Sequence, residues 1–146
     1  MKQTMNILIL LLSLVVATGL YAGEISQQLK IMIKGTKSST GVINVGLYNT
    51  EADFSDREKI YQGQRIAANG AESLVIFTNL PAGEYAVAVY HDENANGKLD
   101  KNFVGIPKEA YGFSNDAHGV FGPPSFKDAK LVVEAGSSLE TVINLK

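Results

Sequence analysis

The sequence predicts an all-β protein, an antiparallel Greek-key β-sandwich of about seven strands. Apolar and polar residues alternate along several short segments, and this is the period of a strand with one buried face. The segments recur roughly every ten residues, with Gly, Asn, Ser and Pro between them, which are the residues that form turns. Helical periodicity is hard to find after residue 22. This combination is typical of antiparallel sandwiches.

The first 22 residues differ from the rest and predict a secretory signal peptide. A lysine near the start is followed by the apolar run Met5–Val16 and by small residues before Ala22. Cleavage is expected after Ala22 or after Gly19. The run is short for a membrane span, which takes about 20 residues, although an uncleaved anchor is the alternative. We therefore expect a signal peptide at 1–22, one domain at 23–146 and a periplasmic or secreted protein.

Composition limits the classes of partner and the sources of stability. Without the signal peptide the chain has 12 basic and 15 acidic residues, a net charge of −3 with His neutral. That balance excludes a nucleic-acid partner, which requires a basic face, and no run of Lys and Arg indicates a membrane surface. The chain has no Cys, so its stability has to come from its own core or from a bound ion. We expect a monomer without a membrane span, whose partner is an unknown ligand or an envelope protein.

The first two predicted strands lie in segments 24–35 and 41–50, which alternate most clearly. Their expected buried faces carry Leu29, Ile31, Ile33, Ile43, Val45 and Leu47. A polar loop, NTEADFSDREK, follows the second strand. A short strand within 60–70 then ends at an Asn-Gly turn signal, and 71–80 forms the next strand. Near the C-terminus, KDAKLVVEAG and SSLETVINLK indicate two strands joined by a Gly-Ser turn.

A tyrosine corner is predicted between strands 71–80 and 84–92. Pro81 and Gly83 form a tight turn, and Tyr85 enters the next strand directly after it. A Tyr in this position can bond its hydroxyl to upstream backbone, as in Greek-key sandwiches. The motif therefore supports the fold class and carries no chemistry of its own.

Residues 101–126 fit no strand pattern and form a long loop excursion. They are rich in Gly and Pro and contain the aromatic residues Phe103, Tyr111, Phe113, Phe121 and Phe126. A segment this apolar does not predict disorder, so we expect it to pack on one end or edge of the sandwich as a satellite core. The alternative is a recognition surface in which Tyr111, Phe113 and Phe121 face a sugar or a peptide.

Three stretches together resemble a known family: VGLYNTEADF, LPAGEYAVAVYHDENANGKLDKNFVGIPKEAYGFSNDA and FGPPSFKDAKLVV. They are similar to the secreted bacterial proteins that share domain of unknown function 2141, over about residues 31–146. The L-P-x-G-x-Y-x-V pattern also resembles transthyretin-like and carboxypeptidase-regulatory-like domains. Ala95 lies where the family pattern leads us to expect Gly or another small residue. The resemblance implies an exported β-sandwich and no agreed activity.

The stretch HDENANGKLDKNF contains the first half of an EF-hand-type calcium loop. With Asp92 as position 1, the pattern D-x-[DN]-x-[DN]-G places Gly97 at the sharp turn. The predicted metal ligands are Asp92, Asn94, Asn96, Lys98 through its carbonyl, and Asp100. Calcium takes six to eight oxygen ligands, and oxygens two residues apart converge when the chain curls. These five positions therefore predict a weak, structural Ca²⁺ site.

The second half of the calcium pattern is missing. Position 12, usually a bidentate Glu, is Phe103. The candidates for a further ligand from elsewhere are Glu93, Glu109 and Asp116. An ion-free turn is the alternative, because Asp and Asn bond their own backbone in turns.

The function expected from these observations is an exported, non-catalytic binding or accessory module. No catalytic residues and no organic cofactor are predicted. The alternative from another class is a periplasmic hydrolase that uses His91, Asp116 and His118, although close neighbours rarely form a triad. A third possibility is a purely structural envelope component.

Overall fold

The computed structural model describes residues 27–146, and the signal peptide expected at 1–22 lies outside the described residues. The elements in chain order are β1 (Gln28–Lys34), β2 (Val42–Tyr48), β3 (Gln62–Ala67), β4 (Ser73–Thr78), β5 (Gly83–Asp92), β6 (Tyr111–Phe113), the 3₁₀ turn η1 (Ser114–Asp116), α1 (Phe126–Ala129), β7 (Leu131–Val133) and β8 (Ser138–Asn144). The described part of the chain contains no helix that is long and apolar enough to cross a bilayer.

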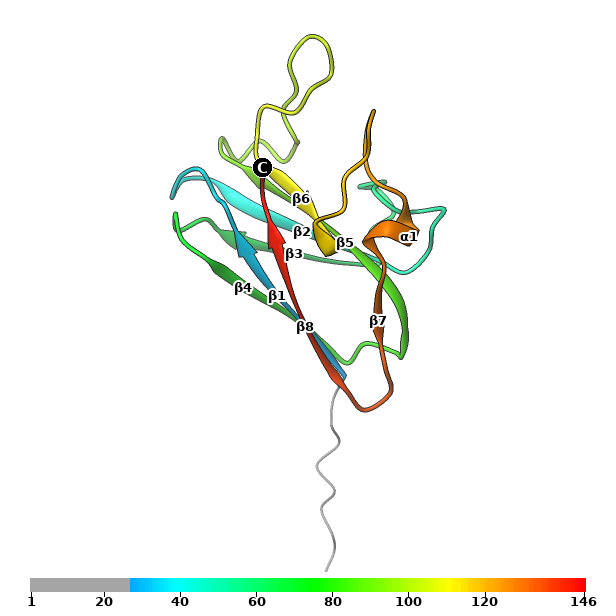
Figure 1. The fold of residues 1–146 in the computed structure, drawn as a ribbon. Coiled ribbons are helices and arrows are strands. Elements are labelled where there is room, and N and C mark those ends of the chain that lie inside the picture. The colour runs from blue at the N-terminus through cyan, green and yellow to red at the C-terminus, as the bar shows by residue number, and fades with distance from the viewer. Residues whose placement is uncertain (1–26) are drawn as a thin grey trace, which may run out of the picture.

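The strands form two facing sheets (Figure 1). One has the order β4-β1-β8, and the other has the order β3-β2-β5-β6, with β7 also paired to β5. The predicted all-β sandwich is therefore confirmed. One pairing differs from the antiparallel expectation, because β1 and β8 run parallel. Parallel neighbours need a long connection, which the rest of the domain supplies because β1 and β8 lie at opposite ends of the chain.

The main core lies between the two sheets and consists of the alternate residues that the period of two predicts. All six residues assigned to the buried faces of the first two strands are 2% exposed or less. Phe77, Val75, Val87, Val89 and Ile143 complete the layer from the other strands. At about 1.5–3 kcal/mol for each large apolar side chain removed from water, this layer is the main source of stability.

The tyrosine corner is present and determines where β5 begins. The Tyr85 hydroxyl donates a hydrogen bond to the Pro81 carbonyl at 2.7 Å, and Tyr85 is buried. The corner carries the chain from β4 in one sheet to β5 in the other. From there β5 runs through the centre of its sheet and ends at Asp92, which is the first residue of the predicted calcium loop.

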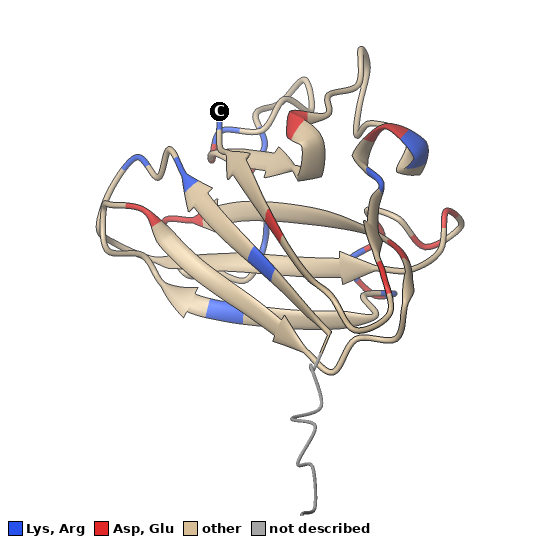
Figure 2. Ribbon diagram, turned by 60° about the horizontal axis from the view of Figure 1, so that its bottom comes forward, with Lys and Arg blue, Asp and Glu red and all other residues tan. Residues whose placement is uncertain are grey.

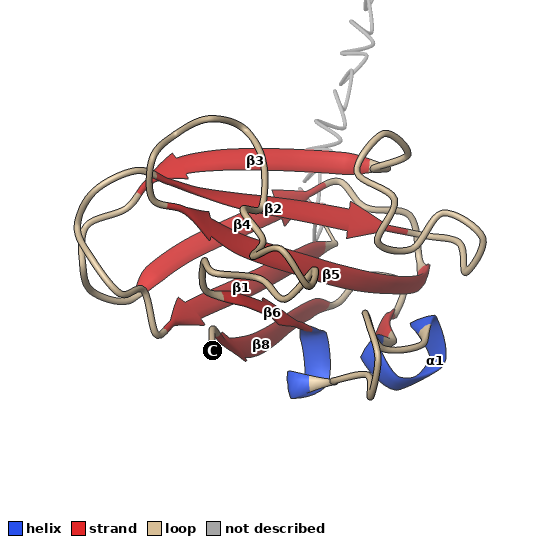
Figure 3. Cartoon of the chain, turned by 90° about the horizontal axis from the view of Figure 1, so that it is seen from above, coloured by secondary structure: helices blue, strands red, loops and turns tan. Residues whose placement is uncertain are grey.

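The 101–126 excursion contains structure that the sequence pattern does not predict, namely β6 and η1, and α1 begins at its end. Both helical turns lie on one side of the sandwich (Figure 3). There Phe126, Ala129 and Ala86 form a second small core. The ring of Phe54, from the loop after β2, meets the ring of Phe113 at 5.9 Å and that of Phe126 at 5.8 Å.

The expectation of an aromatic satellite core is therefore correct for Phe113 and Phe126. It is wrong for Phe103 and Phe121, whose side chains are fully exposed.

Candidate metal centre

Asp92 is buried at the N-terminal end of the predicted calcium loop, and its carboxylate holds the loop in a tight turn. One carboxylate oxygen accepts the Asn96 N–H at 3.0 Å, and the other accepts the Gly97 N–H at 2.7 Å. Gly97 has a φ of +79°, a conformation that suits Gly. Ala95 has a φ of +55°, so the position where the family resemblance leads us to expect Gly is a left-handed one. The loop is thus wound tightly around a fully buried carboxylate.

Asp100 closes the loop from its other end. Its carboxylate accepts hydrogen bonds from the side-chain nitrogens of Asn94 at 2.8 Å and Asn96 at 3.0 Å. These bonds, Asn96 first and Asn94 second, hold the pKa of the Asp100 carboxyl below its ordinary value of 3.8. Asn94, Asn96 and Asp100, three of the five predicted ligands, therefore lie in contact with one another.

The amide oxygens of the two asparagines point to backbone N–H groups. The oxygen of Asn94 accepts from Asn96 N at 3.1 Å, and the oxygen of Asn96 accepts from Lys98 N at 2.8 Å. The spacing of two residues thus produces successive Asx turns, and nitrogens rather than oxygens face Asp100. This is the hydrogen-bonding pattern of the ion-free alternative. Lys98 contributes its backbone N–H to it, while its side chain is exposed.

Glu109 joins the two ends of the loop. It is 6% exposed, and its carboxylate accepts Glu93 N at 2.9 Å and Asp100 N at 2.8 Å. Of the three residues that sequence reasoning offers as a further ligand, Glu109 therefore lies against the loop backbone. Asp116 lies away from the loop, and its carboxylate accepts hydrogen bonds from the backbone N–H and the side-chain nitrogen of Asn144 at the end of β8. The bond from the Asn144 N–H lowers the pKa of the Asp116 carboxyl.

Arg57 contacts the 92–100 loop, and the sequence does not predict this contact. Its guanidinium donates to the Tyr90 hydroxyl and to the Gly97 carbonyl, and it lies 4.6 Å from the centre of the Tyr90 ring. Arg57 is 40 residues from Gly97 in the sequence. No local pattern therefore signals the contact, which depends on β2 and β5 being neighbours.

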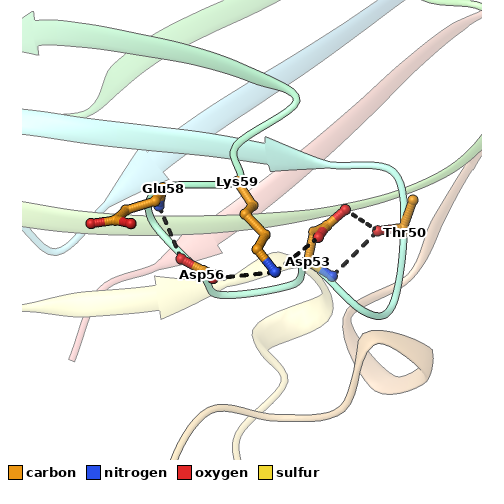
Figure 4. Close-up of polar contacts among 5 residues, drawn as sticks. All are labelled: Thr50, Asp53, Asp56, Glu58 and Lys59. Carbon is orange, nitrogen blue, oxygen red and sulfur yellow. Dashed lines mark hydrogen bonds and ion pairs between the residues drawn. The ribbon is translucent and has the colours of Figure 1, made fainter.

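The loop that carries Arg57 is ordered by its own polar contacts (Figure 4). Thr50 donates to Asp53 at 2.6 Å, and Asp56 accepts Glu58 N at 3.0 Å. The Lys59 ammonium lies 3.7 Å from Asp53 and 3.8 Å from Asp56. These contacts hold both sides of the turn from which Arg57 extends.

The three residues of the hydrolase alternative do not form an acid–histidine pair. His91 is fully buried, and its Nε2 lies 2.7 Å from the Thr40 carbonyl. Nδ1 of His118 lies 3.5 Å from the backbone carbonyl of Asp116, not from its carboxylate. A triad requires the base to contact both the nucleophile and the acid, and no such series is in place.

A small pocket in the described part of the chain lies beside His118. Its cavity volume is about 60 Å³, and its lining includes Tyr111, Asp116, Asn144 and Lys146. Small-molecule sites are commonly about 300–1,000 Å³. A cavity of this volume is too small to enclose a typical organic ligand.

Among residues 27–146, no group of three or more His, Cys, Asp or Glu residues is placed to hold a metal ion. A cation in the 92–100 loop would depend on amide and backbone oxygens in addition to Asp92 and Asp100. Those are oxygen ligands of the kind that calcium accepts, and two carboxylates alone would hold it weakly.

Comparison with known proteins identifies a family. A family described as an uncharacterized protein conserved in bacteria, DUF2141, matches residues 31–140. No curated protein and no solved structure matches the chain. The matched range runs from β1 into β8 and contains the whole 92–100 loop. It confirms the resemblance to this family, while the likeness to transthyretin-like and carboxypeptidase-regulatory-like domains stays a prediction. The chain therefore belongs to the DUF2141 family of uncharacterised bacterial proteins.

Proposed function

We propose that this protein is an exported, non-catalytic binding or accessory module whose 92–100 loop takes up a calcium ion as a structural element. One observation carries the proposal: Asn94 and Asn96 converge on the Asp100 carboxylate at 2.8 and 3.0 Å, while Asp92 keeps the chain curled. The side chains that a cation would need therefore lie together at one place.

Uptake of calcium needs only a local rearrangement. A carbonyl oxygen has two lone pairs, so Asn94 and Asn96 can each keep their backbone bond and turn the second lone pair inward. Their nitrogens then leave Asp100, whose carboxylate binds the ion. Asp92 and the Lys98 carbonyl would supply the remaining protein oxygens. With two formal charges in the site, we expect a dissociation constant of roughly 10⁻⁴–10⁻³ M, as in extracellular modules.

Thermal melting with and without calcium tests the proposal. At a calcium concentration ten times the dissociation constant, binding stabilises the folded state by about 1.4 kcal/mol, which raises the melting temperature by several degrees. Asp100→Asn preserves the shape of the side chain and removes its charge, and it should abolish the increase. Asp116→Asn is the matched control, because this Asp also accepts bonds from an Asn but lies outside the loop, and it should respond like the wild type.

The calcium proposal fails if the melting temperature of the wild type is the same in about 10 mM Ca²⁺, ten times the weakest dissociation constant expected, and in chelator. It also fails if magnesium gives the same increase or if Asp100→Asn retains it, because the effect would then not come from a calcium loop.

Export is supported by the N-terminal pattern of residues 1–22. The expected result is a processed chain outside the cytoplasm that begins after Gly19 or Ala22, read by N-terminal sequencing of fractionated cells. An unprocessed chain in the cytoplasm would contradict export.

A further inference from the structure

Two loop tips at one end of the sandwich expose apolar side chains. The first tip, residues 102–106, carries Phe103 at 100% exposure, Val104 at 61% and Ile106 at 60%, and the second tip, residues 119–122, carries Val120 at 86% and Phe121 at 103%. Both tips rise from the end of the molecule that carries the C-terminus (Figure 1). Single exposed apolar residues are ordinary, whereas grouped ones mark interaction sites.

Four backbone N–H groups of the first tip, those of Asn102, Val104, Gly105 and Ile106, are bonded within the tip. The Asn102 side-chain oxygen accepts Val104 N at 3.0 Å and Ile106 N at 2.9 Å. The Asn102 carbonyl accepts Gly105 N at 2.9 Å, and Asn102 N donates to the Ile106 carbonyl at 2.8 Å. A buried donor without a partner is costly in an apolar medium. This tip can therefore enter such a medium with the N–H groups of Val104, Gly105 and Ile106 already paired.

The first tip itself has no charged residues, and a lysine lies on each side of it in the sequence. Residues 102–107 and 117–126 contain no Asp, Glu, Lys or Arg, and both tips are accordingly tan in Figure 2. Lys101 and Lys108 are exposed at the base of the first tip, where an isolated bridge pairs Lys101 with Pro107. Asp100 and Glu109 flank these lysines, but they are half-buried and buried, and their carboxylates accept bonds from amide and backbone N–H groups. The exposed charged residues at this base are therefore the two lysines. An apolar tip above a basic base matches acyl chains beneath anionic headgroups.

A protein partner matches this surface less well. A stable protein interface uses about 20–30 residues from each side, whereas the tips offer five apolar side chains on two narrow projections. A bilayer accepts convex projections and requires no complementary pocket. We propose that Phe103, Val104, Ile106, Val120 and Phe121 form a docking surface that inserts into the interfacial layer of an anionic lipid bilayer. This inference rests on the proposed binding role and names the partner, and it does not require calcium.

Fluorescence of Phe103→Trp tests insertion at the tip itself. The chain has no Trp, so the new indole reports only this position, which matters because the apolar run Met5–Val16 could bind lipid on its own. With vesicles of phosphatidylcholine and phosphatidylglycerol, we expect the emission to shift to shorter wavelength and to be quenched by brominated acyl chains. Vesicles of phosphatidylcholine alone should give a weaker response, and added salt should reduce the anionic one.

Second-site variants in the Phe103→Trp background distinguish insertion through the two tips from nonspecific adsorption of exposed apolar residues to lipid. Phe121→Ser should weaken partitioning about tenfold or more, because a buried Phe contributes that much. The pair Lys101→Gln and Lys108→Gln should weaken binding to anionic vesicles about thirtyfold. Leu74→Ser is the matched control, because Leu74 is also an exposed apolar residue, at 52%, but lies on β4. It should bind like the parent, and circular dichroism should show that every variant is folded.

Three outcomes would overturn the docking surface. The first is unchanged emission with both kinds of vesicle. The second is equal weakening by Leu74→Ser and Phe121→Ser. The third is an emission shift without lipid that grows with protein concentration, which would assign the tips to a second copy of the chain. Calcium-dependent melting of the same preparation is a separate readout: if it persists while the lipid response is absent, the docking surface alone is wrong.

Discussion

Asp92 and Asp100 belong to the same loop, and their different environments determine what each contributes. The Asp92 carboxylate is buried beneath the loop and bonds two backbone N–H groups. Asp100 lies nearer the solvent and bonds two side-chain amides. A buried acceptor that pairs with backbone donors is expensive to remove, because the donors are left without a partner. Asp92 is therefore the structural anchor of the loop, and Asp100 is the residue that can exchange its partners for an ion.

Substitution of each Asp by Ala should separate these roles. We expect Asp92→Ala to lower the free energy of unfolding by about 2–4 kcal/mol, because two charge-assisted hydrogen bonds are lost at once. Asp100→Ala should cost less than half as much. Urea unfolding followed by circular dichroism measures both. Equal losses would contradict the assignment of Asp92 as the anchor.

The acid titration of Asp100 is a second prediction at this scale. Asn96 and Asn94 lower the pKa of its carboxyl below 3.8. Because the folded pKa is the lower one, this stabilisation is present above the unfolded value and is lost as the pH falls through the folded value. Carboxyl carbon NMR should give a midpoint below 3.8 that Asn96→Ala raises. A midpoint at or above the ordinary value, or one that Asn96→Ala leaves unchanged, would show that the amides do not hold the carboxylate.

At the scale of elements, the 101–126 excursion has a packed part and an exposed part. Phe113 and Phe126 pack with Phe54 beside β5, whereas Phe103 and Phe121 stand in solvent at the two tips. The packed part fixes the position of the tips, since Ser114 donates to the Ala129 carbonyl and accepts Val87 N at 2.9 Å. The middle of the excursion is therefore hydrogen-bonded to β5 through Ser114, whereas the tips at 102–106 and 119–122 expose their apolar side chains to solvent.

Two alanine substitutions in the excursion should show this division. Phe126→Ala should lower the free energy of unfolding by about 3 kcal/mol, because it empties a packed aromatic site. Phe121→Ala is the matched control and should change stability by less than about 0.5 kcal/mol, as expected for an exposed residue. Chemical unfolding measures both. A large loss from Phe121→Ala would mean that the second tip is packed rather than displayed.

The sequence predicts the strands well and the loops poorly, for a physical reason. In a strand with one buried face, apolar and polar residues alternate, so the inward residues of β1 and β2 can be identified directly from the sequence. An aromatic residue in a loop carries no such period. Phe113 and Phe103 both belong to the 101–126 segment, which has no strand periodicity, and Phe113 is covered because it packs with Phe54 and against the α1 cluster.

The candidate site shows the same limit. The spacing of Asp92, Asn94, Asn96 and Asp100 predicts that their side chains converge, because turns bring alternate residues together. It does not predict which atoms face inward, since backbone N–H groups compete for the amide oxygens. The contact between Arg57 and Gly97 depends on the pairing of β2 with β5, so the residues next to either one in the sequence do not predict it.

At the scale of the whole molecule, the sandwich separates the start of the domain from its proposed binding end. β1 begins at the end opposite the two tips, while the C-terminus lies beside them (Figure 1). β8 pairs in parallel with β1 and so ties both ends of the domain into one sheet. The 92–100 loop adjoins the first tip directly, because Lys108 N donates to the Asp100 carbonyl at 2.8 Å. We therefore expect an ion in the loop to stiffen the base of the first tip.

Amide NMR during a calcium titration tests the central claim most directly, because it reads the loop residue by residue. The proposal predicts saturable shifts concentrated between residues 92 and 101, with a midpoint in the range of roughly 10⁻⁴–10⁻³ M, and their loss in Asp100→Asn. Amides unchanged through about 10 mM calcium, or shifts of equal size beside unrelated surface carboxylates such as Glu134, would contradict it.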